Sequence, residues 1–488
     1  MRPLARLPVR ALPVSSLPFR TWDAIVVGSG PNGLAAAATV AKAGFTVLVL
    51  EAAGEIGGGA RTADLTLPGF LHDECSAIHP LAASSPVLRA MRLEDHGLQW
   101  IQPAAPLAHP LDGGRAVVLE RSPAATAARL GEDEESYRRL LEPAVSNWDL
   151  LTGARLRRPD RPAGLLRFAW TCVRSARGAV HSQFRGVPAR ALLAGLAGHS
   201  NLSPDDPLGA GFGLFLGAAG HAAGWPFPRG GAGQIARALA SYLRSLGAAL
   251  RTGTRVDSLD DLPRCRMILC DVSPRELARI GGHRFPASYR SQLTNYSYGP
   301  GAFKVDWALD SAIPWAAADC RLGATVHLGG TAEEIAASEQ AVWSGQCPEQ
   351  PFVIAAQHTL FDRSRAPAGK HTAWAYCHVP NGSTADMTER IEQQIERFAP
   401  GFRRRILARS VTSPADFECR NPNLVGGDFC GGANVWRQLI ARPTVHTYRT
   451  PDQRVLLCSS STPPGAGVHG MCGYFAARVA LRRLRRGA

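Results

Sequence analysis

The sequence predicts an α/β fold that contains a Rossmann-type domain with a parallel sheet. Three observations predict it. A glycine-rich turn joins two apolar runs within residues 22–51, a glycine-led helix and strand follow within 225–275, and a strand, turn and helix stand at 455–484. The 488 residues, 45% hydrophobic, suffice for the cores of roughly two to three domains.

The segment 22–51 carries the most informative pattern. A β-branched run at 23–27 leads into GxGxxG, an alanine-rich helix follows, and a second apolar run at 45–50 ends in an acid. In such a unit the glycines permit a tight turn, close approach of a pyrophosphate and packing of helix on strand, while the helix N-terminus faces the phosphates. The acid can accept hydrogen bonds from a ribose. The predicted dinucleotide-binding residues here are Gly28, Gly30, Pro31, Asn32, Gly33 and Glu51.

A second glycine-rich element, EIGGGART, follows at 55–62. Its glycines let the backbone pass close to another stretch of diphosphate, with guanidinium and hydroxyl donors beside it. A fold that binds NAD alone has no need of this element, so it favours a flavin dinucleotide. The predicted contacts are Gly58, Gly59, Ala60 and Arg61.

These motifs resemble the FAD-dependent amine oxidase and phytoene desaturase superfamily, and above all the phytoene-dehydrogenase-related group that contains pyridine nucleotide-disulfide oxidoreductase domain-containing protein 2. The likeness runs from about residue 22 to 484. It implies FAD as cofactor, a strand carrying Val256 beside the adenine, and a C-terminal turn and helix that close the flavin site. The contacts that the resemblance adds are Val256, Gly465, Gly467, Val468 and His469.

The motifs at the start, middle and end therefore predict one FAD-binding domain assembled from discontinuous segments, with an inserted α+β substrate domain. Strands are expected from Ala302, Ala324, Phe352 and His371, and helices from Ala332 and Met387. The predicted division is a flexible extension at 1–21, an FAD-binding domain at 22–85, 225–275 and 416–488, and a substrate domain at 86–224 and 276–415.

Two side chains are candidates for catalysis. Lys304 is one of only three lysines among 54 basic residues and lies in an apolar strand, at a place where flavin amine oxidases carry a lysine; the alternative is an ordinary ion pair with Asp306. His469 lies in the turn beside the expected flavin and could donate to it or to substrate, or could cap a helix.

Other residues near the motifs have two interpretations each. His72, Asp73 and His79 could approach the other flavin edge, although hydrogen bonding within the loop is the commoner role of such residues. Trp225 and Phe227 could wall an apolar substrate channel or belong to the core.

The net charge of +14 comes almost entirely from arginine, which indicates a GC-rich, bacterial genome rather than a nucleic-acid partner. Residues 151–190 hold nine arginines against the single acid Asp160. This segment is either a solvated helical face or a surface for peripheral contact with an anionic membrane.

The eleven cysteines form no CxxC pair, and Cys265 and Cys270 are expected on opposite faces of one strand. Free thiols, a cytoplasmic location, no membrane span and no metal site are predicted. The apolar stretch 207–228 is interrupted by glycines and is expected to form a tight buried lining.

The first functional hypothesis is an FAD-dependent oxidoreductase that dehydrogenates a hydrophobic, isoprenoid or polyene-like substrate by hydride transfer to flavin N5. A second strand–GxGxxG–helix unit is absent from the sequence, so reoxidation by oxygen or a quinone is expected rather than by firmly bound NAD(P)H. Amine oxidation, favoured by Lys304, is the second hypothesis. A non-catalytic binding protein, like the Rab GDP-dissociation inhibitors, is the third; the sequence does not indicate the oligomeric state.

Overall fold

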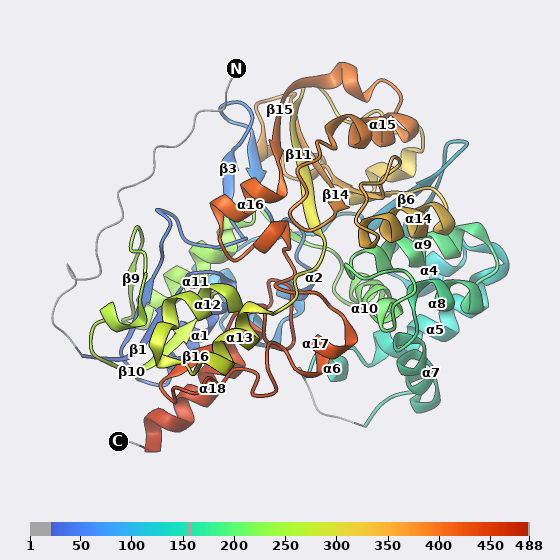
Figure 1. The fold of residues 1–488 in the computed structure, drawn as a ribbon. Coiled ribbons are helices and arrows are strands. Elements are labelled where there is room, and N and C mark those ends of the chain that lie inside the picture. Colours follow the sequence, from blue (N-terminus) through green and yellow to red (C-terminus); the bar gives the residue numbers. More distant parts are fainter. Residues whose placement is uncertain (1–20, 155–157, 487–488) are drawn as a thin grey trace.

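The computed structural model describes residues 21–154 and 158–486, so the extension predicted for 1–21 falls almost wholly outside the described residues. One half of the molecule, at the lower left of Figure 1, is built on a five-stranded parallel sheet of order β16-β10-β1-β2-β9. Its strands are β1 (Trp22–Val27), β2 (Val47–Leu50), β9 (Ala249–Arg251), β10 (Cys265–Cys270) and β16 (Val455–Leu457). The three predicted segments therefore meet in one Rossmann-type sheet.

Helices cover both faces of this sheet, as the apolar residues on both faces of a parallel sheet require. One cluster of buried side chains joins α1, α11 and α18 to one face, and a second joins α12 and α13 to the other. The bounds are α1 (Pro31–Lys42), α11 (Gly233–Ser245) and α18 (Met471–Arg486) on the first face, and α12 (Pro274–Gly281) and α13 (Ala287–Thr294) on the second.

The packing moves two of the expected domain boundaries. Val87, Leu88 and Leu98 are buried against the parallel sheet, although residues from 86 onward were assigned to the second domain. Leu277 and Leu293 of α12 and α13 are likewise buried in the core of the parallel sheet. Both segments carry apolar side chains that the sheet needs as cover, so they belong to the dinucleotide-binding half.

The other half contains a seven-stranded mixed sheet of order β15-β11-β14-β13-β12-β6-β7, in which only the β6–β12 pair is parallel. Strands are present at each of the four predicted positions. The bounds are β6 (Ala105–Leu111), β7 (Arg115–Leu119), β11 (Gly301–Leu309), β12 (Gly323–Leu328), β13 (Val353–Ala356), β14 (His371–Val379) and β15 (Ile406–Thr412). One face packs on helix α15 (Thr388–Phe398).

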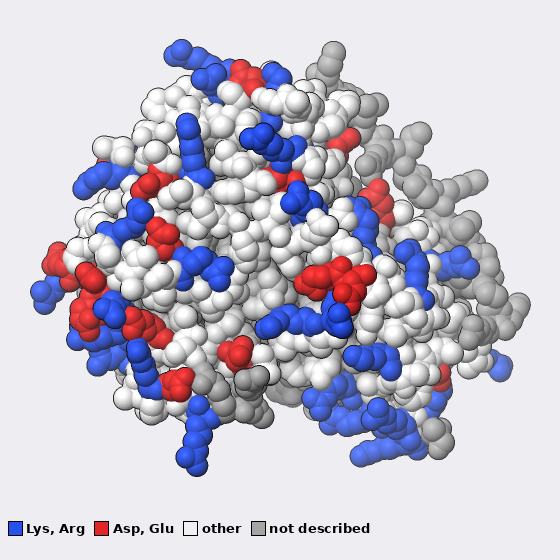
Figure 2. Space-filling view, turned by 180° about the vertical axis from the view of Figure 1, so that it is seen from behind, with Lys and Arg blue, Asp and Glu red and all other residues white. Residues whose placement is uncertain are grey.

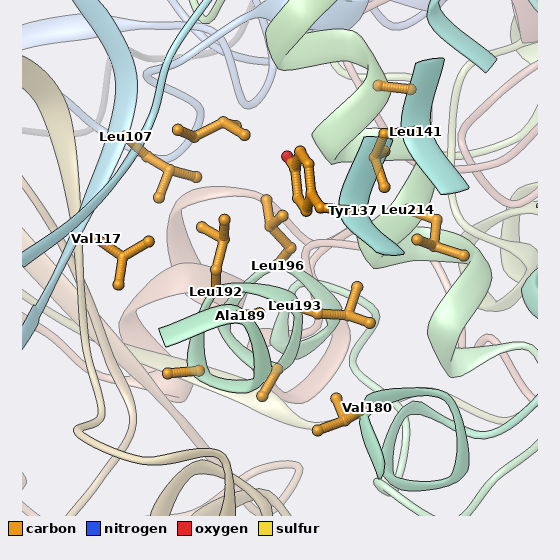
Figure 3. Packing of buried hydrophobic residues seen from close by; sticks show 14 of the residues in the cluster. Leu107, Val117, Tyr137, Leu141, Val180, Ala189, Leu192, Leu193, Leu196 and Leu214 are labelled. Carbon is orange, nitrogen blue, oxygen red and sulfur yellow. The ribbon is translucent and has the colours of Figure 1, made fainter. Parts of the chain in front are cut away.

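A layer of helices covers the opposite face of the seven-stranded sheet and encloses a large apolar core. Figure 3 shows the leucines of α9 lying between strand residues Leu107 and Val117 on one side and Tyr137, Leu141 and Leu214 on the other. The helices are α4 (Pro123–Ala127), α5 (Glu134–Ser146), α6 (Trp148–Leu151), α7 (Pro162–Cys172), α8 (Ala176–Gln183), α9 (Val187–Gly198), α10 (Gly209–Ala222) and α14 (Ala332–Trp343).

The glycine-rich stretch expected as a lining is the helix α10. Its glycines are poor helix formers, but Gly213 faces α9 so closely that a Cβ there would lie 2.8 Å from the backbone nitrogen of Ala197. Tertiary packing therefore overrides the local propensity. Among the described residues, no helix combines the length and the apolar character needed to cross a membrane.

Short elements complete the fold. They are two small antiparallel sheets and several short helices. The bounds are β3 (Thr62–Asp64), β4 (Leu71–Asp73), β5 (Trp100–Ile101), β8 (Phe227–Pro228), α2 (Pro80–Ser84), α3 (Pro86–Arg89), α16 (Pro414–Arg420) and α17 (Trp436–Ile440).

Candidate functional site

A cavity of about 1170 Å³ lies at the carboxyl edge of the parallel sheet and extends between the two halves of the molecule. The residues that follow four of its strands line it, namely Gly28 after β1, Glu51 after β2, Asp271 after β10 and Ser459 close behind β16. Ligands of open parallel sheets bind at this edge, where strand ends and helix N-termini meet.

The glycine loop between β1 and α1 leaves no space for side chains. Gly28 has φ +99°, and a Cβ there would lie 2.7 Å from the carbonyl oxygen of Asp271. A Cβ on Gly30 would lie 2.5 Å from Asp271 Oδ2. Both residues line the cavity, and only glycine fits at either position beside Asp271.

Glu51 is held with its carboxylate toward the same loop. Its Oε2 accepts hydrogen bonds from the backbone N and Oγ of Ser29, at 2.9 and 2.6 Å, and its Oε1 accepts one from Ala53 N at 2.8 Å. A carboxylate has about four acceptor sites, so capacity remains for a ribose hydroxyl. Ser29 was not predicted, although its position within the GxGxxG pattern could have indicated it.

The second glycine element folds against the first. A Cβ on Gly58 would lie 3.0 Å from Cα of Gly30, so the two glycine turns are in contact. Arg61 pairs with Glu74 at 3.2 Å. In the described part of the chain, neither Arg61 Nε nor Asn32 Oδ1 has a hydrogen-bond partner, although both atoms are buried and both residues line the cavity. Orphaned donors and acceptors in such a cradle fit a bound dinucleotide.

Most of the predicted cofactor contacts line this cavity, but two do not. Gly33 and Gly465 lie behind it: a Cβ on Gly33 would meet Gly28 O at 2.3 Å, and Gly465 O accepts a hydrogen bond from Cys472 Sγ at 3.4 Å. Both therefore shape the loops rather than face a ligand. The lining residues are Gly28, Gly30, Pro31, Asn32, Glu51, Gly58, Gly59, Ala60, Arg61, Val256, Gly467, Val468 and His469.

Val256 reaches the cavity from a loop, and not from the strand that the resemblance implied. Strand β9 ends at Arg251, after which the backbone N of Thr254 donates to Glu51 O at 2.8 Å and that of Gly253 donates to Ala53 O at 2.8 Å. These bonds tie the chain to the loop after β2, so the strand cannot continue.

Asp271 is a lining residue that the sequence analysis missed. Its Oδ2 accepts a hydrogen bond from the backbone N of Gly33 at 2.8 Å, so it caps the first turn of α1. Burial, reinforced by the nearby Glu51 charge, raises the pKa of Asp271 to about 7 against the effect of the Gly33 N–H. The acid stands directly after the apolar run RCRMILC, and an acid at the end of a parallel strand is a signal that could have found it.

Lys304 lies at the cavity, as a catalytic residue would, and also forms the ion pair that was the alternative. It lies on β11, is buried, and lines the cavity. Its Nζ donates to a carboxylate oxygen of Asp306 and, at 3.0 Å, to the carbonyl oxygen of Asp73. The Asp306 carboxyl is buried too, yet Lys304 and His72 hold the pKa of that carboxyl below its usual value. The ammonium is thus an ion-paired charge beside the cavity.

A network of buried charges lies behind Lys304. Asp73 accepts hydrogen bonds from Arg365 Nη1 at 2.6 Å and from the backbone N of Ala232 at 2.7 Å. Burial would raise the pKa of Asp73, but the Arg365 charge outweighs it and the pKa is about 2. His72 Nδ1 lies 3.4 Å from Asp306. His72 and Asp73 therefore join β4 to the helix α11 and the strand β11, and do not line the cavity.

His79 does line the cavity, and its Nε2 lies 2.6 Å from Ser76 Oγ. Burial lowers the pKa of His79 to about 4, so the ring is neutral. His469 is neutral for the same reason, with a pKa of about 4. Its Nδ1 accepts a hydrogen bond from the backbone N of Met471 at 3.0 Å, at the start of α18. His469 therefore caps this helix at the wall of the cavity.

The far end of the cavity is apolar. Trp225 contributes to this wall, whereas Phe227 is buried against Arg365, whose guanidinium lies 5.4 Å from the ring. Only the first of the two predicted channel residues therefore faces the cavity. The principal apolar side chains of this end are Leu151, Phe168, Phe212, Phe215, Leu216 and Phe429.

Comparison with known proteins agrees with this geometry. Residues 26–92 match the family model of the NAD(P)-binding Rossmann-like domain. The chain is 26% identical to mouse pyridine nucleotide-disulfide oxidoreductase domain-containing protein 2, over 95% of this chain and 94% of the mouse protein. A solved oxidoreductase from Methanosarcina mazei superposes with a TM-score of 0.64 at 16% identity, covering 94% of this chain and 100% of that one.

Two further solved structures share the fold. A triple mutant of putrescine oxidase superposes with a TM-score of 0.60 at 16% identity, over 96% of this chain and 99% of the oxidase. A Rab GDI from Plasmodium falciparum superposes with a TM-score of 0.53 at 11% identity, over 96% and 98%. The resemblance drawn from the motifs is confirmed: the chain has the fold of the FAD-dependent amine oxidase superfamily and is homologous over nearly its full length to pyridine nucleotide-disulfide oxidoreductase domain-containing protein 2.

Proposed function

We propose that the protein is an FAD-dependent oxidoreductase that dehydrogenates a hydrophobic, isoprenoid or polyene-like substrate. FAD, when bound, would accept a hydride at N5 and pass the electrons to oxygen or a quinone. The observation that carries the proposal is the continuity of one cavity, which has backbone, Glu51 and Arg61 at one end and apolar side chains from α7 and α10 at the other.

The residues of the first end would hold the dinucleotide. The glycine turns at Gly28–Gly30 and Gly57–Gly59 leave backbone open to phosphates, Glu51 has acceptor capacity for a ribose, and Arg61 Nε is a buried donor without a partner among the described residues. These features support FAD as the resident group. Without a ligand, the buried Arg61 donor would lack a hydrogen bond and the acceptor capacity of Glu51 would go unused.

The residues between the two ends would tune the reaction. Lys304 and Asp306 keep an ion pair beside the cavity, and a fixed positive charge favours negative charge that develops nearby. The helix α18 directs its N-terminus toward the cavity, where Val468, His469 and Met471 are lining residues. Its amides have the same electrostatic effect.

Amine oxidation is less well supported by the aromatic residues at the cavity. Trp374 and Tyr376 both line it from β14, but they stack with ring centroids 6.1 Å apart at an interplanar angle of 22°. A carbon atom held between two rings needs contact distances of about 3.5 Å to each, or about 7 Å in total. This pair therefore leaves no slot for the carbon of a C–N bond.

A non-catalytic role like that of a Rab GDP-dissociation inhibitor is disfavoured by the dinucleotide end. Side chains do not fill the glycine turns, and Gly28, Gly30, Glu51 and Arg61 all remain at the cavity. Among the described residues, the buried atoms Arg61 Nε and Asn32 Oδ1 have no hydrogen-bond partner, and a retained cofactor would supply one.

The test is spectroscopic. The purified protein is expected to show flavin bands at ~370 and ~450 nm, and to bleach anaerobically when given an isoprenoid or polyene from a panel that also contains primary amines. Bleaching by amines alone would replace the proposed substrate class with amine oxidation. A colourless protein that cannot be reconstituted with FAD would favour the binding-protein alternative.

A further inference from the structure

The helix α7 exposes apolar side chains that nothing in the described chain covers. Leu166 and Trp170 are 72% and 73% exposed, and Val173, at the end of the same helical face, is 47% exposed. The spacing i, i+4, i+7 places the three side chains on one stripe of the helix. A Trp and a Leu exposed to this extent on adjacent turns mark an interaction surface rather than random scatter.

The opposite side of α7 belongs to the cavity. Phe168 is buried and lines the apolar end, and Cys172 lines it one turn later. The helix is thus a single layer between the cavity and the exposed stripe. Whatever covers Leu166 and Trp170 therefore lies next to the place where an apolar molecule would be held.

A second exposed apolar group flanks the same end of the cavity. Trp436 and Ile440 of α17 are 50% and 75% exposed, while Leu439 between them lines the cavity. In Figure 1, α7, α6 and α17 lie in the lower right part of the molecule. Two helices therefore present apolar side chains outward around one end of one cavity.

Basic side chains accompany the apolar ones. Arg158 and Arg167 form no ion pair with any described residue, whereas Arg161 and Arg177 are paired with Glu142 and Asp205. Figure 2, which views the molecule from behind, shows basic side chains on that face with acidic ones among them.

We propose that the surface formed by Leu166, Trp170 and Val173 of α7, together with Trp436 and Ile440 of α17, docks on an anionic lipid bilayer. An interfacial helix of this kind inserts its Trp and Leu side chains into the boundary between headgroups and acyl chains, while arginines bind lipid phosphates. Arg158 and Arg167 are free to do so. The charge and the exposed aromatic residues fit a bilayer better than they fit a water-facing surface.

Docking in this orientation would set the apolar end of the cavity against the lipid, so a hydrophobic substrate could enter without crossing water. That consequence rests on the proposed function, whereas the docking itself requires no flavin and no turnover. Binding to vesicles therefore tests the surface separately from the chemistry.

The experiment is co-sedimentation of the full chain with vesicles of phosphatidylcholine alone or mixed with phosphatidylglycerol. The double variant Leu166→Gln/Trp170→Gln should bind the mixed vesicles at least about tenfold more weakly than wild type, because two apolar anchors are lost. Arg158→Gln/Arg167→Gln should bind more weakly than wild type only at low salt. At high salt, counterions screen the attraction between these arginines and the lipid phosphates, so wild type loses the same advantage. Leu407→Gln, at a site 48% exposed on β15, is the matched control and should bind like wild type.

Quenching by brominated lipids locates the contact. The fluorescence that wild type shows in excess of Trp170→Phe comes from Trp170. Brominated lipids in mixed vesicles should quench it if Trp170 enters the bilayer. Equal sedimentation of wild type and the Leu166/Trp170 double variant would overturn the proposal. The proposal would also be overturned if wild type formed a dimer that binds no vesicles and the Leu166/Trp170 double variant were a monomer. The surface would then join two copies of the chain. Far-ultraviolet circular dichroism checks that each variant is folded.

Discussion

The two ends of the cavity are built from different material. At the dinucleotide end, the binding surface is mostly backbone, and glycines bring it to the cavity; a Cβ at Gly30 would already meet Asp271 at 2.5 Å. At the other end, the surface is made of side chains such as Phe212 and Phe215 on α10. Backbone surfaces tolerate almost no substitution, whereas an apolar wall can change side chains and keep its character. We therefore expect the first end to fix the cofactor and the second to set the substrate.

The largest effect is expected at Gly30. Gly30→Ala should abolish FAD retention, because its Cβ must displace the Asp271 carboxylate that caps α1. The measurement is bound flavin per chain after gel filtration. Gly299→Ala is the control, since a Cβ there meets nothing closer than 3.6 Å, and it should keep its flavin. Full flavin content in Gly30→Ala would mean that the loop can rearrange.

Lys304 lies between the two ends, and its loss should affect stability as well as chemistry. Lys304→Met leaves Asp306 buried without its ammonium partner, which should lower the free energy of unfolding by about 3–5 kcal/mol in a urea titration. Adding Asp306→Asn should recover most of this loss, since the unpaired charge is removed. If the double variant also reduces its flavin at the wild-type rate, Lys304 has a structural role only.

Asp271 makes the dinucleotide end sensitive to pH. The folded chain keeps this proton up to about pH 7, whereas the unfolded chain releases it near the ordinary aspartate pKa of 3.8, so stability falls as the pH rises through this window. In the flavin-free protein, the difference in the free energy of unfolding between wild type and Asp271→Asn should change by about 2–3 kcal/mol from pH 5 to pH 8. A difference independent of pH would show that Asp271 is ionised throughout.

The fold and the dinucleotide end could be predicted to a large extent because their determinants are local. GxGxxG between two apolar runs requires a strand, turn and helix, and the acid at Glu51 follows from the strand that precedes it. The sequences from Ala302, Ala324, Phe352 and His371 likewise carry the apolar content of buried strands.

The remainder depends on contacts between distant segments. The helix α10 exists because its glycines fit against the backbone of α9, and Val256 leaves its expected strand because Thr254 bonds to Glu51. Asp271 acquires its role only when β10 is placed beside β1, some 240 residues away in sequence. No local pattern encodes such pairings, so periodicity alone could not reveal them.

The apolar end should be separable from the cofactor. Phe212→Glu places a charge among Phe168, Phe215 and Leu216, which an apolar substrate cannot solvate. We expect full flavin content but about tenfold slower flavin bleaching by a hydrophobic substrate. Phe212→Leu, which keeps the wall apolar, should bleach at nearly the wild-type rate. Loss of flavin in Phe212→Glu would mean that the two ends are not independent.

The smallest effect is expected at His469, where the structure favours a cap over a proton donor. Its Nδ1 accepts the Met471 N–H, so His469→Ala should cost about 1 kcal/mol in urea unfolding through loss of the cap. Asparagine can offer its Oδ1 at a similar position, so His469→Asn should restore most of that stability. Asparagine lacks the imidazole that a donor role would need, and flavin reduction in His469→Asn should nevertheless stay within about twofold of wild type. A stable His469→Asn variant with much slower reduction would assign the imidazole to the chemistry, and the boundary between the two ends would then include a reacting side chain.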